Sequence, residues 1–269
     1  MYTVKAFIIA LILLVVVIAS YQFANNSKEV VAEATTIRVM AAASLTEVFN
    51  DLTVGFEEKY DGINLELNYA GSQALYSQIK SGVSADIFAS ANIKYMNQLK
   101  DTDMVLNPSI FAHNKLVVAV SKGNADIQSI DDLVREGVKL VIADESVPVG
   151  RYTMKMLDKQ VDNPKVSKDY KEKFLNSVVS KELDVKSVVA KVELGEADAG
   201  IVYKTDINAS NLEKVRVVDI ADEYNVIATY PISLLKGLTE KHQEAAERFL
   251  DYLYSKEGEE VLEAHGFTK

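Results

Sequence analysis

Residues 36–79 read TIRVMAAASLTEVFNDLTVGFEEKYDGINLELNYAGSQALYSQI. Within this stretch, 36–40 and 63–69 carry the β-branched or alternating apolar residues that are typical of strands. Each is followed by a turn of small residues and then by apolar residues spaced three or four apart, which is the helical period. The segment is therefore predicted to form two successive strand–turn–helix units.

The same alternation of strand-like and helix-like segments continues to the C-terminus. It predicts further strands at 86–89, 115–121, 139–143, 200–203, 214–220 and 226–233, and further helices at 95–100, 152–158, 185–194 and 239–254. Such alternation is typical of an α/β fold, in which helices cover both faces of a parallel or mixed sheet. No linker interrupts residues 35–269, so two lobes would have to be joined by continuous strands.

Four short turns, each leading into a predicted helix, form the candidate binding site. They lie at 42–45, 70–73, 147–152 and 183–186. The start of a helix leaves backbone N–H groups unpaired and carries the positive end of the helix dipole. The first three turns follow predicted strands, and ligands of α/β sheets bind beyond the carboxyl ends of strands. Converging helix starts are therefore predicted to bind an oxyanion without a charged side chain.

The individual residues of these turns also have ordinary structural interpretations. Ser44 and Ser72 stand where a hydroxyl commonly caps a helix. Val149 and Val185 offer only backbone N–H groups, and their turns can be plain connections into a helix. Tyr203 ends a predicted strand, where an aromatic side chain is usually half-buried. On the residues alone, the binding and the structural interpretations both stay open.

The chain is acidic and contains no cysteine. Its formal net charge of −10 argues against nucleic acid as a partner, because basic patches supply most of that affinity. The lack of cysteine excludes disulfides, thiolate metal sites and a lipid-modified N-terminal cysteine. The three histidines have no metal-ligand spacing, and no glycine-rich phosphate motif or nucleophile elbow occurs. We therefore expect neither an enzyme nor a bound cofactor.

The N-terminus has the layout of an export signal. Lys5 precedes an uninterrupted run without polar side chains at 6–19, and a charge followed by such a run is typical of secretory signals. The run is shorter than the roughly 20 residues that a membrane-spanning helix needs. Residues 1–24 are predicted to be a signal peptide or an N-terminal membrane anchor, and residues 25–35 a tether. The protein is accordingly expected to be extracytoplasmic.

Taken together, the motifs resemble the bacterial-type molybdate-binding proteins of ABC importers, within the type II periplasmic binding protein class. The resemblance is carried by AAASLT at 41–46, GS at 71–72, ADIFASA at 85–91, VPVGRY at 147–152 and GEADAGIVY at 195–203. It implies two α/β lobes, with mixed sheets flanked by helices and a hinge between the lobes. It assigns residues 36–118 and 227–269 to the first lobe and residues 119–226 to the second.

The resemblance also assigns the residues that would bind the anion. They are implied to donate hydrogen bonds to a tetrahedral molybdate dianion from hydroxyl or N–H groups: Ser44, Ser72, Val149, Val185 and Tyr203. None of them would coordinate the metal directly. Val149 stands where alanine is common in the family, which keeps the N–H group and adds bulk. Asp184 is the acidic residue within the matched turns, and it is expected to cap a helix.

The implied function is that of a monomeric, extracytoplasmic solute-binding protein that delivers molybdate or tungstate to an ABC import permease. Charge-assisted hydrogen bonds from neutral donors suit a dianion. Sulfate is smaller and would not reach every donor, and a donor-only site offers no acceptor to the proton of hydrogen phosphate. Two alternatives stay open: a binding protein for another oxyanion such as sulfate, and an anchored enzyme that acts on a small anion.

Overall fold

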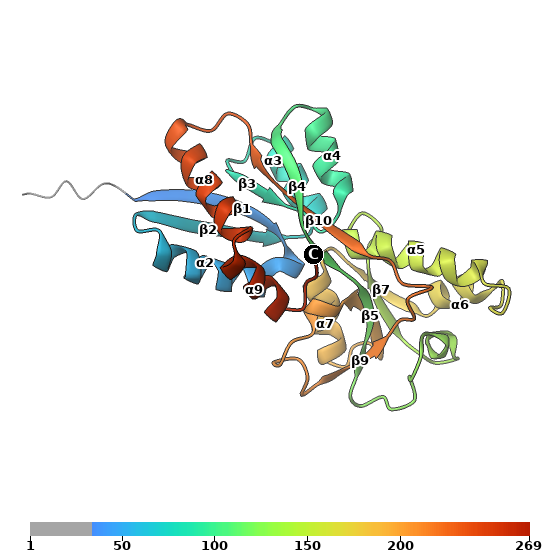
Figure 1. The fold of residues 1–269 in the computed structure, drawn as a ribbon. Helices are drawn as coiled ribbons and strands as arrows, with labels where there is room; N and C mark the ends of the chain where they lie inside the picture. Colours follow the sequence, from blue (N-terminus) through green and yellow to red (C-terminus); the bar gives the residue numbers. More distant parts are fainter. Residues whose placement is uncertain (1–33) are drawn as a thin grey trace, which may run out of the picture. The chain divides into compact units, whose positions relative to one another are not determined.

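Residues 34–269 are described by a computed structural model, and their strands form two separate five-stranded sheets (Figure 1). The predicted signal peptide or anchor at 1–24 lies outside these residues, as does most of the tether predicted at 25–35. The last residue of that tether, Thr35, is instead the first residue of strand β1, where it pairs with Ile63. No helix within the described part of the chain is long and apolar enough to cross a membrane.

The first sheet has the strand order β2-β1-β3-β10-β4. Its strands are β1 (Thr35–Ala42), β2 (Ile63–Ala70), β3 (Ile87–Ala89), β4 (Val105–Asn114) and β10 (Ala228–Leu235). β1 runs parallel to β2 and β3, whereas β10 is antiparallel to β3 and β4. The sheet is therefore mixed, and β10 joins it from a distant part of the sequence.

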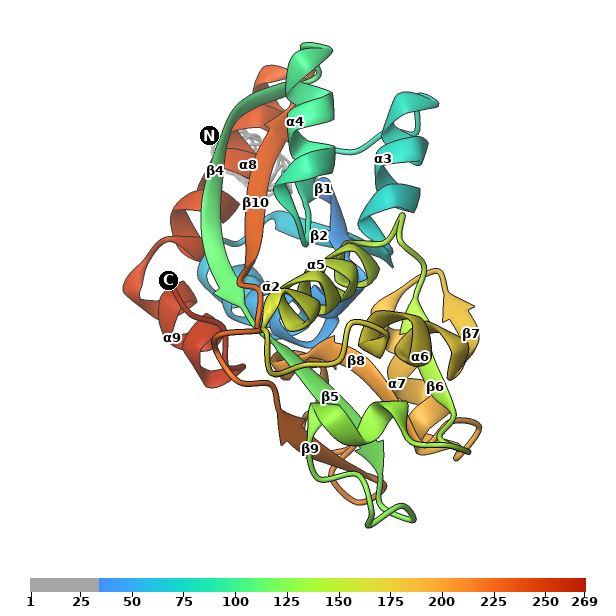
Figure 2. The same ribbon diagram turned by 90° about the vertical axis from the view of Figure 1, so that its right-hand side faces the viewer.

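Helices cover both faces of this sheet (Figures 1 and 2). They are α2 (Thr46–Lys59), α8 (Glu240–Leu253) and α9 (Lys256–Ala264) on one face, and α3 (Ser72–Lys80) and α4 (Ile93–Asp101) on the other. Ile37 and Val39 of β1 belong to the same buried cluster as Phe49 of α2. Met40 belongs to a second cluster, with Leu75 of α3. The alternation that predicted β1 thus separates two apolar cores.

The second sheet has the order β7-β6-β8-β5-β9. Its strands are β5 (Leu116–Ser121), β6 (Leu140–Ala143), β7 (Val178–Glu182), β8 (Ala199–Tyr203) and β9 (Val215–Asp219). Its helices are α5 (Pro148–Asp162), α6 (Tyr170–Asn176) and α7 (Val185–Glu193), and short 3-10 helices lie at η1 (Ala43–Leu45), η2 (Ile130–Val134) and η3 (Lys204–Asp206). α5 and α7 both pack against β6 and β8. The second sheet and its helices form the second lobe, and the first sheet and its helices form the first lobe.

The chain passes between the two sheets twice, from β4 to β5 and from β9 to β10. Asn225 ties these passages together, because its Oδ1 accepts from the Leu116 N–H at 3.0 Å and its Nδ2 donates to the Leu116 carbonyl at 2.8 Å. β5 pairs only with strands of the second sheet. Residues 116–118, which were predicted to end the first lobe, therefore lie in the second sheet.

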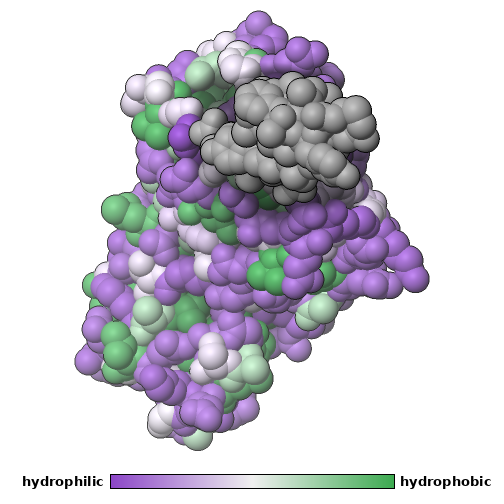
Figure 3. Space-filling model, turned by 90° about the vertical axis from the view of Figure 1, so that its left-hand side faces the viewer, coloured by the Kyte–Doolittle hydropathy of each residue, from purple (hydrophilic) through white to green (hydrophobic). Residues whose placement is uncertain are grey.

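The predicted strands and helices are otherwise confirmed, with boundaries shifted by a few residues, but β4, β7, α6 and α9 were not predicted. Because β7 precedes α7, the fourth turn also follows a strand, which was predicted only for the first three turns. The face shown in Figure 3 is largely hydrophilic outside the grey atoms, with apolar side chains in small scattered groups. Such groups are normal on a protein surface.

Candidate functional site

The four turns converge on one small cavity between the two sheets. It is lined by Ala42, Ala43, Ser44, Gly71, Ser72, Ala91, Val147, Pro148, Val149, Val185 and Tyr203. All the residues predicted to bind the anion are thus brought together, although their roles as ligands stay a prediction. The cavity has a volume of about 10 Å³. Its position at the carboxyl ends of β1, β2, β6, β7 and β8 is where α/β sheets bind ligands.

Three helices begin at this cavity. α3 begins at Ser72, α5 at Pro148 and α7 at Val185, and no side chain caps α3 or α5. The first N–H groups of a helix have no partner within it, so these groups are available to a ligand. The expectation that Asp184 caps α7 is confirmed, because its carboxylate accepts from the Ser187 N–H at 2.8 Å.

Neither serine of the site caps a helix. Ser44 lies within η1, and Ser72 is the first residue of α3 rather than its cap, so the capping interpretation is wrong for both. Ser72 Oγ instead accepts from the Ala91 N–H at 3.0 Å, and Ser44 Oγ lies 3.0 Å from Tyr230 Oη. Both serines are buried. A serine that already accepts a hydrogen bond keeps its own proton for a ligand.

Tyr203 ends β8 with its hydroxyl buried at the cavity. Among the described residues, no group forms a hydrogen bond with this hydroxyl. Burial, together with the nearby Tyr230, Tyr152 and Asp206, raises the pKa of this hydroxyl well above 10. The group therefore stays protonated and is able to donate a hydrogen bond to a ligand. A buried polar atom without a partner is costly, so this hydroxyl is a candidate donor to a bound ligand.

The cavity contains no cationic side chain in its lining. Lys186 follows Val185 directly, but its ammonium pairs with Glu47 at 2.7 Å and lies 3.7 Å from Asp206. Arg151 donates to the Glu145 carbonyl at 3.4 Å. The positive potential at the cavity therefore comes from helix starts and from neutral N–H and O–H donors.

Contacts between the lobes close the structure over the cavity. Gln73 Nε2 donates to the Leu183 carbonyl at 2.6 Å, and the Lys186–Glu47 ion pair also joins the lobes. The Tyr95 hydroxyl donates to the Ser146 carbonyl. Donors from both lobes consequently face one space, as a ligand-driven closure requires.

Asp206 is a fully buried carboxyl that supports Tyr203. Its Oδ2 accepts from the Tyr203 N–H at 2.9 Å. Burial raises the pKa of Asp206 to about 6, although the Lys186 ammonium and the hydrogen bond from Tyr203 both lower it. The folded chain therefore binds this proton more tightly than the unfolded chain does, for which the ordinary value of 3.8 applies.

This pKa predicts how stability depends on pH. The contribution of Asp206 is fully present below about pH 4 and is lost as the pH rises through about 6, a difference of roughly 3 kcal/mol at most. We expect Asp206→Asn to be increasingly stabilised relative to the unaltered chain across this range. Thermal unfolding of both chains from about pH 4 to about pH 7.5 measures the effect. A difference in melting temperature that stays constant with pH would contradict it.

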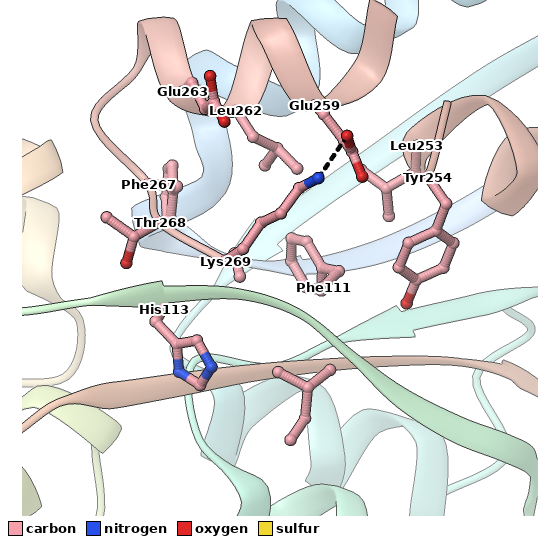
Figure 4. A pocket seen from close by; sticks show the side chains of 12 residues that line it. Phe111, His113, Leu253, Tyr254, Glu259, Leu262, Glu263, Phe267, Thr268 and Lys269 are labelled. Carbon is pink, nitrogen blue, oxygen red and sulfur yellow. Dashed lines mark ion pairs between the residues drawn. The ribbon is translucent and has the colours of Figure 1, made fainter. Parts of the chain in front are cut away.

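A larger cavity of about 370 Å³ lies away from this site, between β4, α9 and the C-terminus (Figure 4). Much of its lining is hydrocarbon, from residues such as Phe111, Leu262 and Phe267. Its charged groups include Glu263 and the Lys269–Glu259 ion pair, at 2.5 Å. An apolar cavity with carboxylates at its rim does not suit an anion. Within residues 34–269, no cluster of three or more histidine, aspartate or glutamate side chains is arranged to hold a metal ion.

Comparisons with known proteins identify relatives of this chain. A family model described as bacterial extracellular solute-binding protein matches residues 37–268. The molybdate-binding protein ModA of Mycobacterium tuberculosis is 33% identical over 238 residues, which cover 88% of this chain and 85% of that protein. The family model extends across both lobes and includes all four turns.

Solved structures show the same two-lobed fold. The substrate binding domain of a putative molybdenum ABC transporter from Clostridium difficile is 29% identical, with a TM-score of 0.65, over 88% of this chain and 99% of that one. The sulfate-binding protein SubI from Mycobacterium tuberculosis has a TM-score of 0.78 over 87% of this chain and 86% of that one. At 18% identity, the second likeness shows the fold alone.

Proposed function

Because this chain belongs to the bacterial extracellular solute-binding protein family, we propose that it captures molybdate outside the cytoplasm and delivers it to an ABC import permease. Tungstate, which has the same shape and charge, is proposed as a second ligand. The protein acts as a monomeric carrier rather than as an enzyme. The N-terminal segment keeps its proposed role as a signal peptide or an anchor.

The buried Tyr203 hydroxyl carries the proposal. It has no partner among the described residues, and it shares its cavity with two serine hydroxyls and with the starts of α3, α5 and α7. All these groups are able to donate hydrogen bonds. A dianion accepts charge-assisted bonds from such donors, which are about twice as strong as neutral ones. The absence of a cationic side chain from the lining is compatible with this ligand.

Sulfate remains the second candidate, because it is also a tetrahedral dianion. Molybdate is favoured because the relative named for it is 33% identical to this chain, whereas the sulfate-binding neighbour is 18% identical. We also expect the larger anion to reach donors on both lobes at once. A smaller anion would leave some buried donors unpaired, at a cost of roughly 1–3 kcal/mol each.

Calorimetric titration of the full chain with molybdate, tungstate, sulfate and phosphate tests the proposal. We expect one-to-one binding of molybdate and tungstate, with sulfate much weaker and phosphate weakest. Thermal unfolding gives a second readout, because a ligand at 100 times its Kd stabilises the fold by about 2.7 kcal/mol. Preferential binding of sulfate would favour the second candidate, and no binding of any of the four anions would refute an oxyanion-binding function.

The Lys186–Glu47 ion pair is expected to contribute to ligand affinity, because it forms across the lobes. We expect Lys186→Met to weaken molybdate binding about three- to tenfold, in line with roughly 1 kcal/mol for a partly exposed pair. The matched control is Lys191→Met, because Lys191 pairs with Glu182 at 2.7 Å within the second lobe. Titration of both variants checks this, and equal effects would show that the pair has no special role in closure.

A further inference from the structure

Tyr230 lies buried directly behind Ser44. Its side chain is fully buried, and its hydroxyl oxygen is 3.0 Å from Ser44 Oγ. Tyr230 is on β10, packs edge-on against the Tyr203 ring at 5.8 Å, and is not part of the cavity lining. It therefore reaches the site only through residues that line it.

The contact between Tyr230 and Ser44 joins two hydroxyls, and either oxygen could be the donor. Both side chains are buried, and each hydroxyl has one proton to donate. When a bound oxyanion accepts the Ser44 proton, the Tyr230 proton is the one left for the contact between the two hydroxyls. Tyr230 then donates to Ser44 Oγ, and Ser44 donates to the anion.

We propose that Tyr230 is a positioning residue that holds the Ser44 hydroxyl as a hydrogen-bond donor to the bound oxyanion. The proton order is Tyr230 O–H to Ser44 Oγ, and Ser44 O–H to the anion. Ser72 has the equivalent arrangement, because its oxygen already accepts from the Ala91 N–H. This inference rests on the proposed function and explains how two hydroxyls, which are able to accept as well as to donate, are both kept as donors.

The arrangement determines which oxyanions are selected. A fully deprotonated anion accepts from every donor in the site. Hydrogen phosphate carries a proton that needs an acceptor, and a serine held by Tyr230 in the donor orientation does not accept from it. Removing the Tyr230 hydroxyl frees Ser44 to rotate and to accept. Tyr230 is thus inferred to contribute to discrimination between deprotonated and protonated oxyanions.

The test is calorimetric titration of full-chain variants with molybdate and with phosphate at pH 7. We expect Tyr230→Phe to weaken molybdate binding about tenfold while phosphate binding is unchanged or improved, so that the preference for molybdate falls. In a Ser44→Ala background, Tyr230→Phe is expected to add no further loss.

The matched control is Tyr152→Phe. Tyr152 also packs edge-on against Tyr203, at 6.4 Å, but its hydroxyl accepts from the Thr229 N–H at 3.4 Å and bonds to no predicted ligand residue. We expect its molybdate affinity to stay within about twofold of the unaltered chain. Melting temperatures establish that each variant is folded. An unchanged molybdate affinity in Tyr230→Phe would overturn the inference. It would also be overturned if Tyr230→Phe weakened molybdate binding equally in the unaltered chain and in the Ser44→Ala background. Failure of the unaltered chain to bind molybdate would instead refute the proposed function, and the inference with it.

Discussion

A chain carrying both Ser44→Ala and Ser72→Ala is expected to bind molybdate about 100-fold to 10,000-fold more weakly than the unaltered chain. Each hydroxyl supplies a hydrogen bond to a charged ligand, worth roughly 1.5–3 kcal/mol, and the two losses are taken as additive. The serines lie on separate turns, in η1 and at the start of α3. Ser72 Oγ also accepts from the Ala91 N–H, and Ser44 Oγ forms a hydrogen bond with Tyr230 Oη, so removal of either hydroxyl leaves a buried group without that partner.

Isothermal titration of the double variant and of each single variant measures this effect. Ser77→Ala is the control, because the Ser77 hydroxyl donates to the Gln73 carbonyl within α3 at 2.9 Å and is not part of the cavity lining. We expect the control to bind molybdate like the unaltered chain. An affinity within threefold of normal in the double variant would remove both hydroxyls from the site.

The features predictable from the sequence are those that depend on neighbouring residues. Strand alternation in 36–40 and 63–69 and the small-residue turns after them placed two helix starts at one edge of a sheet. The resemblance to molybdate-binding proteins implied that the other two turns belong to the same site. The structure places all four turns around one cavity. Serine capping was wrong because Ala91 and Tyr230, distant in sequence, compete for the same hydroxyls.

Elements with broken local patterns were not predictable. β4 contains Asn107, which has a positive φ of 47°, followed by Pro108, and its pairing with β10 is irregular in register. α9 has Gly258 in its first turn, and glycine is a weak helix former. Each forms because a distant partner, β10 or α2, provides the packing surface. Local propensity does not contain that information.

The contacts that control the site are also long-range. Tyr230 is 186 residues from Ser44, and Lys186 is 139 residues from Glu47. Neither pair can be recognised from its spacing in the sequence. The two residues of each pair come together only after β10 has joined the first sheet and the lobes have closed. The turns that line the cavity are thus predictable from the sequence and the family resemblance, whereas the residues that contact them from distant elements require the fold.

Closure itself is expected to fail in Gly71→Ala. The backbone of Gly71, with φ −58° and ψ 138°, suits alanine, so the change is compatible with the first lobe. A Cβ there would lie 2.5 Å from the Leu183 carbonyl oxygen of the second lobe and equally close to the Gln73 side chain. The Gln73 side chain is able to move, but the Leu183 carbonyl is backbone and moves only with its lobe. The variant is therefore expected to hold the lobes apart in this region.

The cost should appear in affinity and not in folding. Partial opening withdraws the Val149, Val185 and Tyr203 donors from an anion held on the first lobe, so we expect a loss of roughly 2 kcal/mol or more, about 30-fold in Kd. Titration with molybdate measures this loss, and small-angle scattering of the ligand-saturated variant should show a more open molecule.

Substitutions at two other glycines distinguish an effect on lobe closure from an effect on stability. Gly123→Ala is the neutral control, because its Cβ would meet only Ser121 Oγ at 3.9 Å. Gly150→Ala places a Cβ 2.1 Å from the Asp144 carbonyl oxygen within the second lobe, so it should lower the melting temperature of the ligand-free chain. Gly71→Ala should leave that temperature unchanged while weakening binding. If Gly71→Ala instead bound molybdate normally, the lobes would not need the close approach at Leu183, and affinity would come from one lobe alone.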